Sequence, residues 1–249
     1  MNRLLKCEIY KLKHSKQLIK FFIFSCFLIA FFPLINYLDS CNSLSDVTAE
    51  IGITFYAQSG IMLIIVFIPN LICAYIDRGF RNKTILHEIM EGHSNKNIIL
   101  SRVISCVTVV IIGVMTCILL YLGILAIING KGDTLDYLEV RVILIAIFLI
   151  HVSLMSVLLC MIFRNGILAA LVIYFRCALL DLGIVSVVKE LIPVFSTKIS
   201  NFFFVSQWPQ ITTGEVNANL VIAVIGSLII ENGILFLIAL YRMNKKEFR

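Results

Sequence analysis

Several motifs of soluble enzymes are absent from this chain of 249 residues. It contains no G-x-x-x-x-G-K-[ST] loop, so we do not expect it to hydrolyse ATP by itself. It has no CxxC pair and no G-x-S-x-G nucleophile elbow. The stretch nearest to an H-E-x-x-H zinc motif, His87–Glu91, ends in a glutamate in place of the second histidine. We therefore expect no catalytic residue, no metal and no directly bound cofactor.

Charged residues are scarce as well, at 14% of the chain against 60% hydrophobic residues, and the mean hydropathy is +0.99. A soluble domain could not keep so much apolar surface from water. A helix needs about 20 apolar residues to cross ~30 Å of hydrocarbon. Six stretches qualify, which predicts an all-α membrane protein with six transmembrane helices in one domain, residues 1–249: Ile19–Leu38, Ile53–Ile76, Val103–Ile128, Val142–Phe163, Ile167–Val188 and Ala218–Tyr241.

The basic residues are distributed unequally between the two sets of loops. Of the 21 Lys and Arg residues, the N-terminal segment, the loop after the second span, Arg164 and the C-terminal tail hold most, whereas the other loops are rich in Asp and Glu. Loops rich in Lys and Arg stay in the cytoplasm. Both termini are therefore predicted to be cytoplasmic. No basic patch alternates with exposed aromatic residues, so a nucleic-acid partner is not expected.

Two further segments are predicted to lie at the membrane surface. In residues 1–18, Leu5, Ile9 and Leu12 form one apolar stripe, widened by Leu4, among lysines. Such a pattern is typical of a helix lying on an anionic lipid leaflet. An orientation signal without further role is the alternative. Residues 186–217 are apolar for a loop and include Trp208, which favours short helices on or dipping into the outer surface. A longer fifth span is the alternative.

The longest predicted cytoplasmic loop covers residues 77–101. Asn82 or Thr84 could cap a short helix with Ile85, Ile89 and Met90 on one face, and Lys83, His87, Glu88 and Glu91 on the others. Gly92 would end this helix and Ser94 would begin the next. A short helix held at the membrane surface has a suitable shape to receive force from a soluble partner.

These segments resemble the type-2 exporter permeases of ABC transporters, the ABC-2 family. The resemblance is carried by Glu8, Lys11 and Leu12 near the N-terminus, by Thr84, Gly92, Ser94, Ile98 and Arg102 between the second and third spans, and by the basic tail Tyr241–Arg249. Asn95 departs from the pattern, which often has Arg at this position. Among such proteins, the chain is most similar to permeases of lantibiotic immunity and peptide-antibiotic efflux.

The resemblance implies a bacterial cell-membrane protein with an N-terminal elbow helix, a coupling helix within 77–101 and a re-entrant segment at 186–217. It implies a dimer with a second permease copy or paralogue, in contact with membrane lipid. It also implies a separate ATPase subunit, which would carry ATP and magnesium. The residues implied to contact that subunit are Thr84, Glu88, Gly92, Ser94 and Arg102.

Four ionisable residues fall inside predicted spans, where each needs a partner or a function: His151, Arg176, Asp181 and Glu231. Arg176 and Glu231 each lie ~15 Å from the inner end of their spans, at 1.5 Å per residue. We therefore expect them to pair between the fifth and sixth spans. Such a pair could be a packing clamp or could have a gating or substrate role.

Two classes of function, and a weaker third, follow from the sequence. The first is the membrane subunit of an ATP-driven exporter of an amphipathic substrate such as an antimicrobial peptide or a drug. The second is a non-transporting immunity or sensor protein that binds a peptide or a lipid. An intramembrane enzyme is the third and has the least support.

Overall fold

The computed structural model describes residues 2–14, 23, 66–129, 138–177, 187, 203–212, 214 and 216–245. Within these ranges all regular structure is helical. The elements are α1 (Asn2–Lys13), α4 (Ile68–Arg81), α5 (Thr84–Met90), α6 (Asn95–Val110), the π-helical turn η3 (Ile111–Met115), α7 (Thr116–Asn129), α8 (Leu138–Phe163), α9 (Gly166–Phe175), α12 (Phe204–Thr212) and α13 (Ala218–Asn244). Because η3 joins α6 to α7 without a break, residues 95–129 form one long helix.

Three of the described helices are long and apolar enough to cross a membrane: Asn95–Leu120, Glu139–Phe163 and Ala218–Asn244. They correspond to the third, fourth and sixth predicted spans and agree with the membrane character read from composition. α4 and α9 cover parts of the second and fifth predicted spans. Apart from Ile23, the first span lies outside the described residues, as do Asp181 and residues 188–202. The count of six spans therefore stays a prediction.

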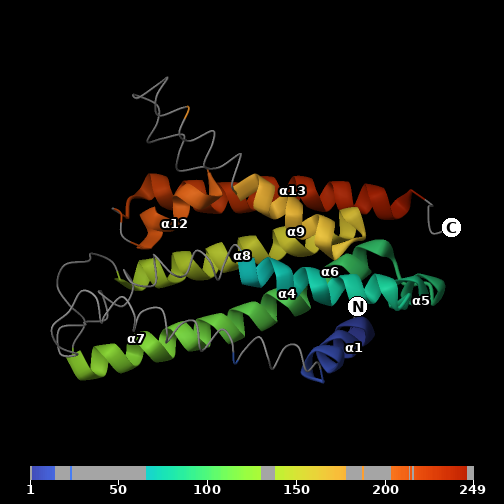
Figure 1. Ribbon diagram of the computed structural model, residues 1–249, viewed down its shortest axis with the longest axis horizontal. Helices are drawn as coiled ribbons and strands as arrows, with labels where there is room; N and C mark the ends of the chain where they lie inside the picture. The colour runs from blue at the N-terminus through green and yellow to red at the C-terminus, as the bar shows by residue number, and fades with distance from the viewer. Residues whose placement is uncertain are drawn as a thin grey trace.

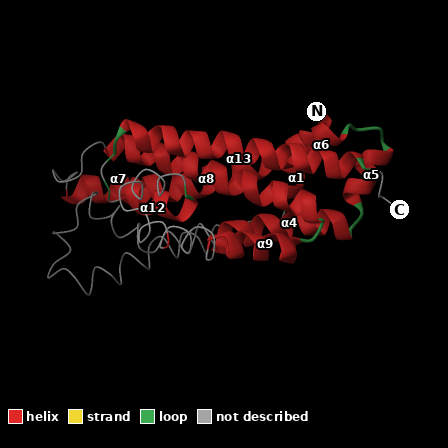
Figure 2. Cartoon of the chain, turned by 90° about the horizontal axis from the view of Figure 1, so that it is seen from above, coloured by secondary structure: helices red, strands yellow, loops and turns green. Residues whose placement is uncertain are grey.

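The long helices lie lengthwise side by side, with α8 in contact with α4, α6, α9 and α13 (Figures 1 and 2). In its apolar stretch α8 has 67% of residues buried, against 17% for α13. A helix that is hydrophobic on all sides suits such a central position. Its buried serines are satisfied locally, because the Ser153 and Ser156 hydroxyls each donate to a backbone carbonyl one turn earlier, at 2.7 Å. The exposed apolar side chains of α13 are compatible with a lipid environment.

The turn between α8 and α9 brings two backbones close together. Asn165 caps α9 by accepting hydrogen bonds from the N–H groups of residues 167 and 168. The Gly166 N–H donates to Asp77 Oδ1 at 3.0 Å, and Asp77 also pairs with Arg81. A β-carbon at Gly166 would lie 2.7 Å from the carbonyl oxygen of Cys73. Only glycine therefore fits this crossing of α4 and α9.

At the other end of the bundle, α12 is the described helical part of the predicted segment 186–217, and it lies beside α13 (Figure 1). Trp208 is 1% exposed and its ring centroid lies 5.5 Å from that of Phe148. The ring therefore packs inside the protein, and its expected place at the membrane surface stays a prediction. Arg141 holds the end of α12 by donating to the carbonyl oxygens of Ile211 and Gly214, at 3.0 and 2.8 Å.

Candidate functional site

The loop 77–101 contains the short helix α5, which lies at the same end of the bundle as α1 and the C-terminal end of α13 (Figures 1 and 2). Its C-terminus is closed by backbone hydrogen bonds from Gly92 N to Ile89 O and from His93 N to Glu88 O. This pair of bonds is a Schellman motif, which needs a left-handed residue. Gly92 supplies it with φ of 83°. Ser94 then caps α6 by accepting a hydrogen bond from Asn97 N at 3.3 Å.

The expected start of α5 needs correction. Neither Asn82 nor Thr84 caps it, because the N-cap position is Lys83, which has φ of 55° and makes no side-chain cap. A capping side chain needs an extended backbone at this position, and the left-handed turn at Lys83 does not provide one. Thr84 is the first helical residue, and its hydroxyl donates back to Gly79 O at 3.0 Å. That bond ties α5 to the end of α4.

The faces of α5 also differ from the expectation. Ile85 is buried as expected, but Met90 is 71% exposed, whereas Glu88 is only 7% exposed. The sequence placed Glu88 with polar residues, away from the apolar face. The structure turns it inward because a buried arginine of α6 lies opposite it. A carboxylate is buried in proteins when a cation compensates it.

That arginine is the centre of a set that we name the buried ion cluster: Glu8, Lys11, Tyr75, Glu88 and Arg102. Arg102 pairs with Glu8 of α1 and with Glu88 of α5, the latter at 2.8 Å. Lys11 reaches the same two carboxylates at 3.0 and 3.3 Å. The Tyr75 hydroxyl donates to Glu8 Oε2 at 2.6 Å. These contacts join four helices, α1, α4, α5 and α6, through residues that lie 67 or more positions apart in the sequence.

Because this cluster is buried, its ion pairs matter for the stability of the protein. Glu8 is 1% exposed and Arg102 is 3% exposed. Removing one member of a buried ion pair leaves an uncompensated charge in a poorly solvated place, which is strongly destabilising. Burial opposes the charge on Lys11, but its attraction to Glu8 outweighs this and raises the pKa of Lys11 above its ordinary value of 10.5. The cluster therefore fixes α1 and α5 to the bundle.

The cluster also determines which face of α1 packs against the bundle. The side chains that face the bundle are Leu4, Glu8 and Leu12, which are all buried. Of the expected stripe, Leu5 is half-buried and Ile9 is 53% exposed. The helix turns in this way because Glu8 must reach Arg102. Its outer face consequently combines apolar Ile9 with basic residues, as an interfacial helix requires.

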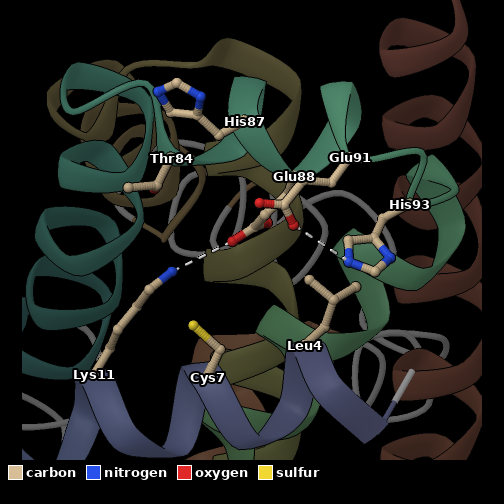
Figure 3. Close-up of a pocket in the computed structure, with 8 residues that line it drawn as sticks. All are labelled: Leu4, Cys7, Lys11, Thr84, His87, Glu88, Glu91 and His93. Carbon is tan, nitrogen blue, oxygen red and sulfur yellow. Dashed lines mark hydrogen bonds and ion pairs between the residues drawn. The ribbon is translucent and has the colours of Figure 1, made fainter.

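A groove of ≈ 610 Å³ lies between α1 and α5 (Figure 3). Lys11 points across it toward Glu88, and His93 faces Glu91 on the other side at 3.7 Å. The remaining lining residues are Leu4, Cys7, Thr84 and His87. The described residues contain no group of three or more His, Cys, Asp or Glu that could hold a metal ion.

The C-terminal helix reaches the same loop. The Asn95 side-chain amide donates to Met243 O at 3.2 Å and to Asn244 Oδ1 at 2.8 Å. Asn95, the residue that departs from the ABC-2 pattern, therefore caps the last turn of α13. Arg164, in the turn before α9, donates to Arg242 O at 3.3 Å.

A second polar set, which we name the mid-bundle cluster, contains His151, Met155, Arg176 and Glu231. The expected pair of Arg176 and Glu231 is present as an ion pair between the end of α9 and α13. His151 Nε2 of α8 lies 3.1 Å from Glu231 Oε2, and Arg176 also contacts Met155 Sδ. The sequence singled out His151 but did not place it with Glu231.

No family model matches this chain, and no curated protein matches it. Its function must therefore be inferred from its own residues. The five residues implied to contact an ATPase are brought to one end of the bundle, but only Glu88 and Arg102 contact each other in a described interaction. Gly92 and Ser94 shape the backbone, and Thr84 anchors α5 to α4.

Proposed function

We propose that this chain is the membrane subunit of an ATP-driven exporter of the ABC-2 type, which moves an amphipathic substrate such as an antimicrobial peptide or a drug out of the membrane. The observation that carries the proposal is the attachment of α5. This helix of seven residues is fastened to α1 and α6 through Glu88 and Arg102, and it borders an open groove. A soluble subunit that pressed on α5 would displace both helices.

The distribution of charge supports a cytoplasmic position for this end. Among described residues, this end carries Lys6 in α1, Arg78 in the last turn of α4, Lys83 before α5, Lys96 in the first turn of α6 and Arg242 in the last turn of α13. A concentration of Lys and Arg at the ends of apolar helices marks the cytoplasmic side. In the proposed exporter, α5 and the groove would therefore lie on the cytoplasmic side of the bacterial cell membrane, where a separate ATPase subunit could bind them.

The mid-bundle cluster suits a protein whose helices change their packing. Glu231 is shared by His151 of α8 and Arg176 after α9. Ionisable groups at membrane depth are costly and are retained as clamps or as parts of a transport path. In the proposed exporter, this cluster would hold α13 against α8 and α9 in one of the two states.

The test is purification from native membranes in a gentle detergent, followed by mass spectrometry of the proteins that co-purify. A stoichiometric soluble protein with a G-x-x-x-x-G-K-[ST] motif is the expected result. Glu91→Lys, which changes an exposed side chain of the groove, should lower the amount of retained ATPase. The matched control is Glu139→Lys, the same change at an exposed residue of the opposite end. Both variants should reach the membrane in normal amounts.

Two results would contradict the proposal. Purification of a folded, monodisperse protein without any ATPase would favour the alternative, a non-transporting immunity or sensor protein that binds a peptide or a lipid. Retention of an ATPase that is equally insensitive to both variants would place the contact elsewhere than at α5.

A further inference from the structure

A second and smaller cavity, of ≈ 230 Å³, lies between α1, α4 and the turn into α5. It shares Lys11 and Thr84 with the groove of Figure 3 but has none of the acidic side chains that line that groove. Its polar lining residues also include Arg78, Asn82 and Arg102. Three cations and no carboxylate therefore surround this cavity.

The charges around the cavity do not balance. Glu8 and Glu88 lie behind the lining and pair with Lys11 and Arg102. Two carboxylates against three cations leave one positive charge, which belongs to Arg78. In the described part of the chain, the exposed Arg78 side chain has no carboxylate partner. A bound group with one negative charge would make the set neutral.

Unused donors are also present. Lys11 has three N–H groups and directs two toward Glu8 and Glu88. Arg102 Nε is buried and has no hydrogen-bond partner among the described residues. A buried donor without a partner is unusual in a folded protein and points to a ligand or an ordered molecule. Guanidinium groups match the oxygens of phosphate particularly well, since they can donate two parallel hydrogen bonds.

From this lining we propose that the basic cavity binds the phosphate of a singly charged phosphate ester, such as the headgroup of an anionic phospholipid. The volume of ≈ 230 Å³ is smaller than the ≈ 300–1,000 Å³ typical of sites for drug-sized ligands, and it suits a headgroup. The cavity adjoins α1, whose outer face carries the exposed Ile9 and Tyr10. Such a helix lies at the depth of lipid headgroups. The site is independent of the exporter proposal, because it does not require an ATPase.

The test is a titration of the purified protein, in an uncharged detergent without lipid, with short-chain phosphatidylglycerol followed by native mass spectrometry. Arg78→Gln should raise the dissociation constant about tenfold, since it removes a charge-assisted hydrogen bond. The matched control is Lys6→Gln, which removes the same charge from an exposed residue that does not line the cavity. Its dissociation constant should change by less than about twofold. Both side chains are exposed, so both variants should keep the helical circular dichroism of the wild type.

Parallel titrations with glycerophosphoglycerol, a soluble phosphodiester with one negative charge, and with inorganic phosphate distinguish the sources of the phosphate. Binding of the lipid alone, weakened by Arg78→Gln, supports a headgroup site. Equally tight and equally Arg78-dependent binding of glycerophosphoglycerol supports the same phosphate chemistry with a soluble ligand. Equal losses in Arg78→Gln and Lys6→Gln would overturn the proposal, because attraction to net charge would then explain the binding. Unchanged binding in Arg78→Gln would overturn it as well.

Discussion

Replacing Arg102 by glutamine should release α1 from the bundle. The change removes the partner of two buried carboxylates, Glu8 and Glu88. Loss of one member of a buried ion pair costs about 3–5 kcal/mol. Glu8 would keep its contacts with Lys11 and Tyr75, so the lower end, about 3 kcal/mol, applies. That free energy corresponds to a roughly 150-fold larger open population of α1.

Limited trypsin digestion measures this opening. α1 contains Lys6 and Lys13, and a protease cuts a helix only when it opens locally. Mass spectrometry of the N-terminal fragments should show cleavage roughly 100-fold faster in Arg102→Gln than in the wild type. The matched control, Lys96→Gln, removes an exposed charge from the same helix, α6, and should change the rate by less than about twofold.

Equal cleavage rates in Arg102→Gln and Lys96→Gln would refute the reasoning, since α1 would then be held by its leucines alone. The pH dependence gives an independent check. The raised pKa of Lys11 means that its stabilising contribution is complete below its unfolded value of 10.5 and is lost as the pH rises through the higher folded value. Docking of α1 should therefore stay constant at neutral pH and weaken only above about 10, and Lys11→Gln should reduce that alkaline loss. The remaining loss comes from Tyr75, whose pKa is also raised by burial and by Glu8.

Three further changes test other parts of the structure. Gly166→Ala should lower the free energy of unfolding by about 1–3 kcal/mol, because the new β-carbon would lie 2.7 Å from a backbone carbonyl of α4. The same change at Gly233, an exposed glycine of α13, should not lower it. Arg141→Gln should release α12 and shift the fluorescence of Trp208, the single tryptophan, to longer wavelength. Exchanging Arg176 and Glu231 should restore part of the stability that either single reversal removes. A double exchange no better than the singles would exclude a pairwise clamp.

The features of this chain that could be predicted from its sequence are local ones. Gly92 ends α5 and Ser94 begins α6, because helix ends are encoded by one or two residues whose backbone or hydroxyl satisfies nearby N–H and C=O groups. The long apolar stretches at 142–163 and 218–241 likewise appear as helices, since length and hydropathy alone specify them.

What the sequence could not show is the partner that each charged side chain meets. The helical pattern assigned Glu88 to a face away from Ile85 and Ile89, but Arg102, 14 positions later, turns it inward. In the same way the apolar stripe of Leu5, Ile9 and Leu12, widened by Leu4, gave no sign that Glu8 faces the bundle. Periodicity reports where apolar residues recur, and it is blind to a carboxylate that a distant arginine compensates. A glutamate between two leucines at positions 4, 8 and 12 was the available signal.

α5 illustrates how these long-range contacts determine a local structure. Isolated helices shorter than about 12–15 residues are only marginally stable in water, so this helix of seven residues depends on contacts with its neighbours. It is fixed at its start by Thr84 on α4, in its middle by Glu88 on Arg102, and at its end by the turn at Gly92. Beyond that turn, Asn95 ties the beginning of α6 to the last turn of α13. A force on α5 would therefore be transmitted to α1 and α6 through buried ion pairs, and to α13 through the side-chain amide of Asn95. Because two ion pairs join α5 to α1 and α6, the buried ion cluster is the stronger connection.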